Sequence, residues 1–246
     1  MTKPTPSDYR HLLRVEAARL SEIGTEHLEL DVPHIDGWTV RSVIGHTGWV
    51  FRFARLALDA DPENPPSRSS VPEPPPGDEV IDWFTVGAAQ LQEALDGTNL
   101  ETPRPTFTGP QPAGWWLRRL SHEVSIHRWD AESAFGHPEP IDARQARDGI
   151  DEVLEVFTPQ RMQFATLDGN GETVHLHATD IDDGEWFMTY GDEAVEWDHS
   201  HAKGDVAARG TVSDLLLLLW SRIPASRLEV FGDASLLDRW QDAATF

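Results

Sequence analysis

Four stretches within residues 1–140 repeat apolar side chains every three or four positions, and this pattern constrains the fold more than any other feature of the chain. Such spacing places the apolar residues on one face of an α-helix. The pattern predicts helices over residues 7–27, 40–58, 79–95 and 115–134, separated by loops rich in proline, glycine and serine. Four amphipathic helices that follow one another so closely are typical of a helical bundle.

After residue 141 the pattern changes to a mixture of strands and helices. Short runs at 173–178, 186–190, 194–199, 206–208 and 228–231 predict strands, and the segments 143–158, 211–221 and 235–243 predict helices. The sequence therefore predicts an α + (α+β) chain. We expect a four-helix bundle over residues 1–140 and a smaller α+β domain over 141–246, with a short mixed or antiparallel sheet.

The composition excludes several classes of function. The chain has no cysteine, which excludes disulfides, thiolate metal ligands and a thiol nucleophile of its own. Its net charge of −22 repels nucleic acid and anionic membrane surfaces. No apolar run is long enough to span a membrane, and the N-terminus lacks the apolar core of a signal peptide. We therefore expect a cytoplasmic protein with no nucleic-acid or membrane partner.

Glu123 and His127 are spaced four apart in the last predicted helix of the bundle. This spacing puts both side chains on one helix face, where together they can hold a divalent metal ion. A third ligand is available at His46, which lies on the apolar stripe of the helix over 40–58. Burying three ionisable groups without a shared partner costs several kcal/mol, and a metal removes that cost. Each feature alone also has another interpretation. His46 could be a hydrogen-bonded core histidine, and Glu123 and His127 could form an ordinary contact between residues four apart on a helix.

The neighbours of this pair have less certain roles. His122 precedes His127 by five residues, so the two imidazoles face apart on a helix, and a zincin motif is excluded. We expect His122 to lie on the surface or behind the ligands. Asp130 follows His127 by three residues and either orients its imidazole or pairs with an arginine such as Arg119.

Four further histidines lie after residue 141, at positions 175, 177, 199 and 201. His175 and His177 alternate along a predicted strand and therefore share one face of it. We interpret all four as polar residues of the surface, and a second metal site is the alternative.

Three segments together resemble the mycothiol-dependent maleylpyruvate isomerase family. Gly37–His46 is similar to the family's tryptophan-to-histidine segment, and Glu123–Glu132 is similar to its Glu-x-x-x-His-Arg-x-Asp segment. In the second half, Leu218–Arg222 and Leu228–Asp233 resemble its closing Leu-x-Gly-Arg and Val-x-Gly-Asp patterns. The resemblance covers nearly the whole chain in order, with Ser221 standing where glycine is common.

The resemblance implies a DinB-like four-helix bundle followed by a smaller α+β domain. It also implies a divalent metal, usually zinc (Zn²⁺), held by His46, Glu123 and His127. Three nitrogen and oxygen ligands from the protein leave a coordination position open, as in catalytic sites. Arg222 matches an arginine that reaches the active site from the second domain, where it would hold a substrate carboxylate or enolate.

The expected function is that of a metal-dependent enzyme that uses a small thiol such as mycothiol against a small electrophilic substrate. The thiol would add to a cis-unsaturated dicarbonyl acid such as maleylpyruvate, and rotation and elimination would give the trans isomer. With another electrophile, the same first step would end as thiol transfer. Two alternatives remain: a hydrolase that uses metal-bound water, and a stress-response or ligand-binding module without catalysis.

Overall fold

A computed structural model describes residues 3–136, 138–161, 169–192 and 194–243 of the chain. The chain divides into two compact units, Pro4–Glu139 and a second unit that comprises Lys3 and the described part of Pro140–Phe246. The first unit is helical and the second contains a sheet, which confirms the predicted fold class. Each unit is described separately below.

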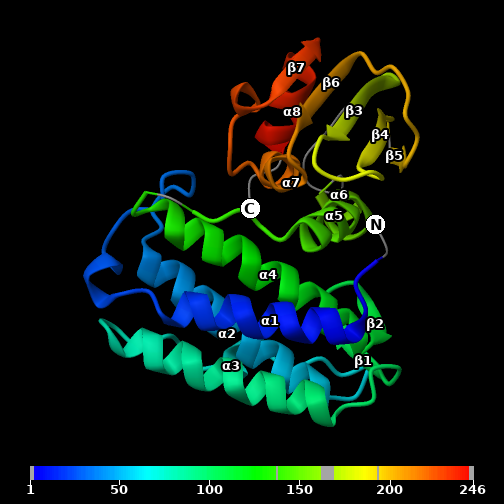
Figure 1. The fold of residues 1–246 in the computed structure, drawn as a ribbon. Helices are drawn as coiled ribbons and strands as arrows, with labels where there is room; N and C mark the ends of the chain where they lie inside the picture. The colour runs from blue at the N-terminus through cyan, green and yellow to red at the C-terminus, as the bar shows by residue number, and fades with distance from the viewer. Residues whose placement is uncertain (1–2, 137, 162–168, 193, 244–246) are drawn as a thin grey trace. The chain divides into compact units, whose positions relative to one another are not determined.

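Four long helices make the first unit: α1 (Pro6–Ser21), α2 (Val40–Asp59), α3 (Glu79–Gly97) and α4 (Gly114–Ser133). Helix α1 contacts α3 and α4, and α2 contacts the same two helices, so the four form a closed bundle (Figure 1). Fully or almost fully buried apolar side chains from all four fill its core: Leu13, Leu20, Ile44, Phe51, Phe84, Leu91, Leu117 and Val124. Because α2 and α4 are neighbours, residues that face each other on these helices meet.

The helix ends follow local chemistry. Thr39 is the N-cap of α2, where its hydroxyl accepts from the Ser42 amide and the Ser42 hydroxyl accepts from the Thr39 amide. The first helix is shorter than predicted, because it ends at Ser21 instead of residue 27. Extended backbone at Gly24 (φ −64°, ψ 145°) breaks the helix, and a separate 3₁₀ turn follows at Thr25–His27.

A small hairpin precedes α4 in a region that the sequence analysis interprets as an irregular connection. Strands β1 (Pro103–Thr106) and β2 (Gly109–Pro112) pair in antiparallel register. Pro105 lies opposite Pro110, and neither can donate a backbone hydrogen bond. Proline at four of the eight strand positions hides this hairpin from sequence patterns. A second proline-rich connection, between α2 and α3, contains a 3₁₀ turn at Arg68–Ser70.

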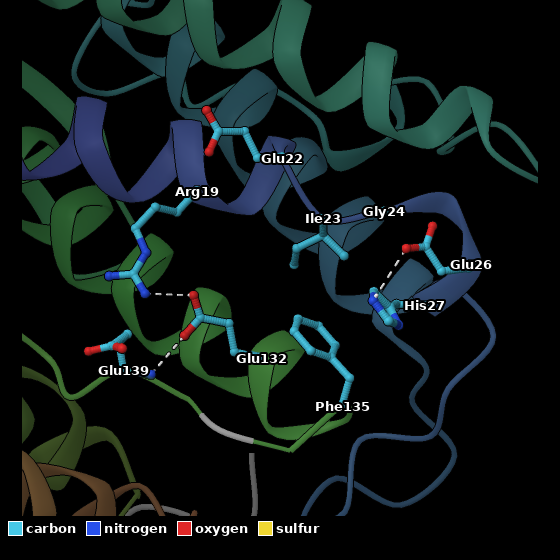
Figure 2. A pocket seen from close by; sticks show the side chains of 9 residues that line it. All are labelled: Arg19, Glu22, Ile23, Gly24, Glu26, His27, Glu132, Phe135 and Glu139. Atoms are coloured by element: carbon cyan, nitrogen blue, oxygen red, sulfur yellow. Dashed lines mark hydrogen bonds and ion pairs between the residues drawn. The ribbon is translucent and has the colours of Figure 1, made fainter.

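A buried ionic network joins α1 to α4. The Arg128 side chain is fully buried, and its Nε donates to Glu16 Oε2 over 2.6 Å. Arg128 Nη1 donates to Glu132 Oε2 over 2.8 Å, and Arg19 Nη2 donates to Glu132 Oε1 over 2.8 Å. Figure 2 shows Arg19 and Glu132 directed toward each other beside a hollow of about 490 Å³ that Phe135 also lines. These charges hold the two helices together at one end of the bundle.

The second unit contains a five-stranded mixed sheet in the order β5-β4-β3-β6-β7. Its strands are β3 (Glu172–Ala178), β4 (Glu185–Tyr190), β5 (Val195–Asp198), β6 (Val206–Gly210) and β7 (Glu229–Gly232). The β3–β6 pair is parallel and the other pairs are antiparallel. Leu176 of β3 and Trp186 of β4 are apolar and fully buried on one face of the sheet. Their neighbours along each strand face the other side.

Short helices accompany this sheet: α5 (Ala143–Glu152), α6 (Thr158–Arg161), α7 (Val212–Leu219) and α8 (Ser235–Ala243), with a 3₁₀ turn at Ala225–Arg227. The predicted helix over 143–158 is interrupted, because Val153–Phe157 form a π-helical turn between α5 and α6. Helix α7 contacts α5, β3 and β6, and its leucine run is buried as expected. Among the helices of the described residues, none is long and apolar enough to cross a membrane.

Ser221 closes α7 in a left-handed conformation, with φ of 57°. Its amide donates to Leu218 O over 2.9 Å, and the Arg222 amide donates to Leu217 O over 2.8 Å. These two bonds define a Schellman motif, in which the left-handed position favours glycine. The departure from glycine at Ser221 therefore leaves the turn intact but places a β-carbon in a strained conformation.

Replacing Ser221 by glycine is expected to raise the free energy of unfolding by about 0.5–1 kcal/mol, because relief of the left-handed strain exceeds the added chain entropy. Urea unfolding of the two proteins measures this difference. Ser221→Ala is the matched control: it removes the same hydroxyl, which donates to Gln241 O over 3.3 Å, but keeps the β-carbon. Equal stabilities for the glycine and alanine variants would contradict the assignment of strain.

Candidate metal centre

The neighbouring helices α2 and α4 bring together the three residues that the sequence analysis selects as metal ligands. Glu123 Oε1 lies 3.2 Å from His46 Nε2 and 3.2 Å from His127 Nε2. One potential ligand atom from each residue lies within 4.8 Å of the others. Two imidazole nitrogens and one carboxylate oxygen are donors that divalent zinc and similar metals accept. The residues present therefore fit the metal that the sequence predicts.

Asp130 fixes the orientation of the His127 ring. His127 Nδ1 donates to Asp130 Oδ2 over 2.9 Å, while the other carboxylate oxygen lies 2.7 Å from His34 Nε2. The Asp130 side chain is fully buried between these two imidazoles. Because Nδ1 is held by Asp130, Nε2 of His127 is the ring nitrogen that faces Glu123, and it can exchange its proton for a metal ion. The sequence allows Asp130 either to orient the His127 imidazole or to pair with an arginine, and the structure has the contact to His127.

Charges at the site keep the Glu123 carboxylate ionised. Burial alone would raise its pKa, but His127 and Arg119 together hold the pKa of Glu123 well below its usual range. Arg119 Nη2 donates to Glu123 Oε2 from one turn earlier on α4. Burial likewise would lower the pKa of His127, but the Glu123 carboxylate outweighs it and raises that pKa to about 9. Positive charge beside Glu123 is thus favoured, and a divalent cation supplies it directly.

The site opens on the side of His46. This side chain is 39% exposed, against 14% for Glu123 and 9% for His127, so it lies at the margin of the apolar stripe instead of within it. The Trp38 ring lies beside both imidazoles, with its centroid 5.1 Å from that of His46 and 6.2 Å from that of His127. Of the three ligands, His46 is therefore the one most exposed to solvent.

A hollow of about 350 Å³ adjoins His46. Trp49 of α2 lines it together with the proline-rich connection that precedes α3, which contributes Arg68, Ser69, Glu73 and Pro74. The Arg68 guanidinium lies 4.9 Å from the centre of the Trp49 ring. The connection thus places both a cation and an anion in the hollow that His46 lines.

Other predicted residues occupy different surroundings. His122 is buried, not on the surface, and its ring packs edge-on against Tyr9 with centroids 6.0 Å apart. Arg222 belongs to the second unit, where its Nη1 donates to Trp220 O over 3.0 Å. Its role toward substrate stays a prediction. His34 was not anticipated as part of the site, because it lies in a loop whose residues carry no periodic signal.

Comparisons with known proteins cover both units. The family model described as the mycothiol maleylpyruvate isomerase N-terminal domain matches residues 9–132, and that described as the MDMPI C-terminal domain matches residues 144–239. A crystal structure of the mycothiol-dependent maleylpyruvate isomerase has a TM-score of 0.65 and 16% identity, over 94% of this chain and 95% of its own. The crystal structure of a histidine-to-alanine mutant of that isomerase has a TM-score of 0.66 and 17% identity, again over 94% of this chain and 95% of its own. No curated protein matches the sequence.

Proposed function

This chain belongs to the mycothiol maleylpyruvate isomerase family of enzymes. We propose that it catalyses cis–trans isomerisation of maleylpyruvate-like acids with a small thiol, such as mycothiol, and a divalent metal, Zn²⁺. The observation that supports the metal is the convergence of His46, Glu123 and His127 within 4.8 Å. The family supports the thiol, and because the chain has no cysteine, a thiol nucleophile would have to come from solution.

A divalent metal held by these three ligands would supply the Lewis acidity that keeps a bound thiol in its nucleophilic thiolate form near neutral pH. The protein groups prepare the site for that role. Asp130 holds the His127 ring in one orientation, and Arg119 holds the Glu123 carboxylate from the side away from His46 Nε2. These fixed contacts reduce the reorganisation that ligand binding requires.

The residues around the open side suit a polar, anionic reactant. The Arg68 guanidinium in the hollow beside His46 can pair with a carboxylate, and Trp38 covers the imidazole rings from one side. Arg222 of the second unit is the other proposed partner for a substrate carboxylate, on the basis of its position in the family pattern. Isomerisation requires transient loss of the substrate double bond, which reversible thiol addition provides.

The thiol requirement is the decisive test. Purified full-length protein loaded with zinc should isomerise maleylpyruvate when mycothiol is present, and the rate should fall to the uncatalysed level when the thiol is omitted. A metal-dependent hydrolase, the alternative from the sequence, would instead turn over ester or amide substrates without any thiol. Turnover that does not depend on added thiol would contradict the proposal.

Asp130→Asn should weaken zinc binding at this site by about 10–100-fold, the usual cost of losing a group that orients a metal ligand. Asparagine offers one acceptor oxygen in place of two, so it cannot accept from both His34 and His127. Competition with a chromogenic chelator measures the affinity. Asp59→Asn, at an exposed ion pair near the end of α2, is the control and should leave affinity unchanged. Equal affinities for both variants would contradict the orienting role.

A further inference from the structure

A second group of metal-ligating side chains lies in the sheet of the second unit and shares no residue with the candidate metal centre. Three imidazoles surround one carboxylate, that of Glu185 at the start of β4. Its oxygens lie 2.6 Å from His175 Nε2, 2.8 Å from His177 Nδ1 and 3.0 Å from His201 Nδ1. One potential ligand atom from each of the four residues lies within 4.8 Å of all the others.

The strand pairing builds this group. His175 and His177 are two residues apart on β3 and share a face, and His177 is the direct partner of Glu185 on β4. His201 comes from the connection between β5 and β6 and completes the group. The three imidazole centroids lie 5.1–6.1 Å apart. Elements separated in sequence thus direct four donor side chains toward a common point.

The four side chains range from buried to exposed, which distinguishes them from polar residues that all face solvent. His175 is 6% exposed, contrary to the surface position expected from its alternation, and the Glu185 side chain is 20% exposed. His177 is 30% exposed and His201 is 73% exposed, so an ion has a path from solvent. The inner part is therefore held in place, and the outermost ligand is free to close over a bound ion.

The donor set selects a class of metal. Imidazole nitrogen suits zinc, copper and nickel, whereas calcium and magnesium prefer all-oxygen sites. In a tetrahedral zinc site with bonds of about 2.1 Å, ligand atoms lie about 3.4 Å apart. The four potential ligand atoms lie within 4.8 Å of one another, so small side-chain rotations are enough to reach that geometry. Four protein ligands are also the number found in closed, structural zinc sites.

We propose that this second group binds one Zn²⁺ ion as a structural site, with the protein ligands His175, His177, Glu185 and His201. The ion fastens the connection between β5 and β6 onto the β3–β4 hairpin. His199, in the same connection, takes no part: its Nδ1 donates to the backbone carbonyl of Glu185 over 2.8 Å and not to the carboxylate. It supplies a matched control.

Zinc stoichiometry and affinity in the full-length chain test the proposal. In a His46→Ala background, which removes a ligand of the first site, the protein should still bind one equivalent of Zn²⁺ by calorimetric titration. Adding His177→Ala and His201→Ala should weaken this binding at least about 100-fold, since even the loss of an orienting group costs 10–100-fold. Zinc should raise the melting temperature of His46→Ala but not that of the triple variant.

One control variant and one single-ligand variant complete the test. His46→Ala/His199→Ala should bind zinc as His46→Ala does, within about twofold. His46→Ala/His201→Ala removes a largely exposed side chain, so it tests one ligand without disturbing the fold. The proposal is overturned if His46→Ala binds no zinc, or if removing His177 and His201 leaves its zinc affinity unchanged. Either result would identify the group as a hydrogen-bonded cluster around Glu185.

Discussion

Alanine at His46 is expected to abolish metal retention at the bundle site and to lower kcat/KM for thiol-dependent isomerisation at least about 10³-fold. The imidazole supplies one of only three protein ligands, and Lewis-acid stabilisation is worth several kcal/mol, of which about 4 kcal/mol corresponds to that factor. Because the side chain is 39% exposed, its truncation should leave the bundle folded. The loss of activity therefore reflects the missing metal ligand and not an unfolded bundle.

Steady-state kinetics and elemental analysis of the same preparation measure both losses. His11→Ala is the control, since it removes an exposed histidine from α1 of the same bundle and should change neither quantity. The zinc content of His46→Ala should fall by one equivalent and not to zero, because the second group in the sheet is expected to retain its own ion. A His46→Ala protein that keeps full activity without metal at the bundle site would refute the proposed function.

The second large effect is on stability: Arg128→Ala should lower the free energy of unfolding by about 3–5 kcal/mol, the usual cost of breaking a buried ion pair from one side. Arg128 is completely buried and donates to Glu16 over 2.6 Å and to Glu132 over 2.8 Å. Alanine removes the cation between these two carboxylates. Glu16, whose side chain is only 6% exposed, then has to be neutralised or hydrated.

Guanidinium unfolding, monitored by the circular dichroism signal of the helices, measures the change in the free energy of unfolding. Arg55→Ala provides the comparison, because its pair with Asp59 is exposed and contributes less than about 1 kcal/mol. Adding Glu16→Gln to Arg128→Ala should recover part of the loss, because the buried carboxylate is then neutral. If Arg128→Ala and Arg55→Ala cost the same, the ionic network does not stabilise the bundle.

The bundle was largely predictable because its helices carry long, regular apolar repeats. Helix α3 was expected over 79–95 and is Glu79–Gly97, and α2 was expected over 40–58 and is Val40–Asp59. The hairpin of β1 and β2 was missed because proline is a negative signal for strands. Helix α1 ends early because the backbone at Gly24 is extended. The spacing of apolar residues, from which the helix over 7–27 was predicted, carries no information on this backbone conformation.

The site was predictable only where its residues lie on helices. The four-residue spacing of Glu123 and His127 carries geometric information, whereas His34 contacts Asp130 from a loop across 96 residues of sequence. The same limit applies to His201, which reaches Glu185 from an irregular connection. Alternation correctly placed His175 and His177 on one face, but it could not reveal that His175 would be covered.

The separation of the bundle ligands along the chain has a thermodynamic consequence. His46 and Glu123 are 77 residues apart and meet only when α2 packs against α4. An ion bound by both residues therefore binds the folded bundle and not the unfolded chain. By mass action, each tenfold rise in free metal above the dissociation constant then adds about 1.4 kcal/mol to the folding equilibrium. Metal supply would thus control how much of the enzyme is folded as well as how much is active.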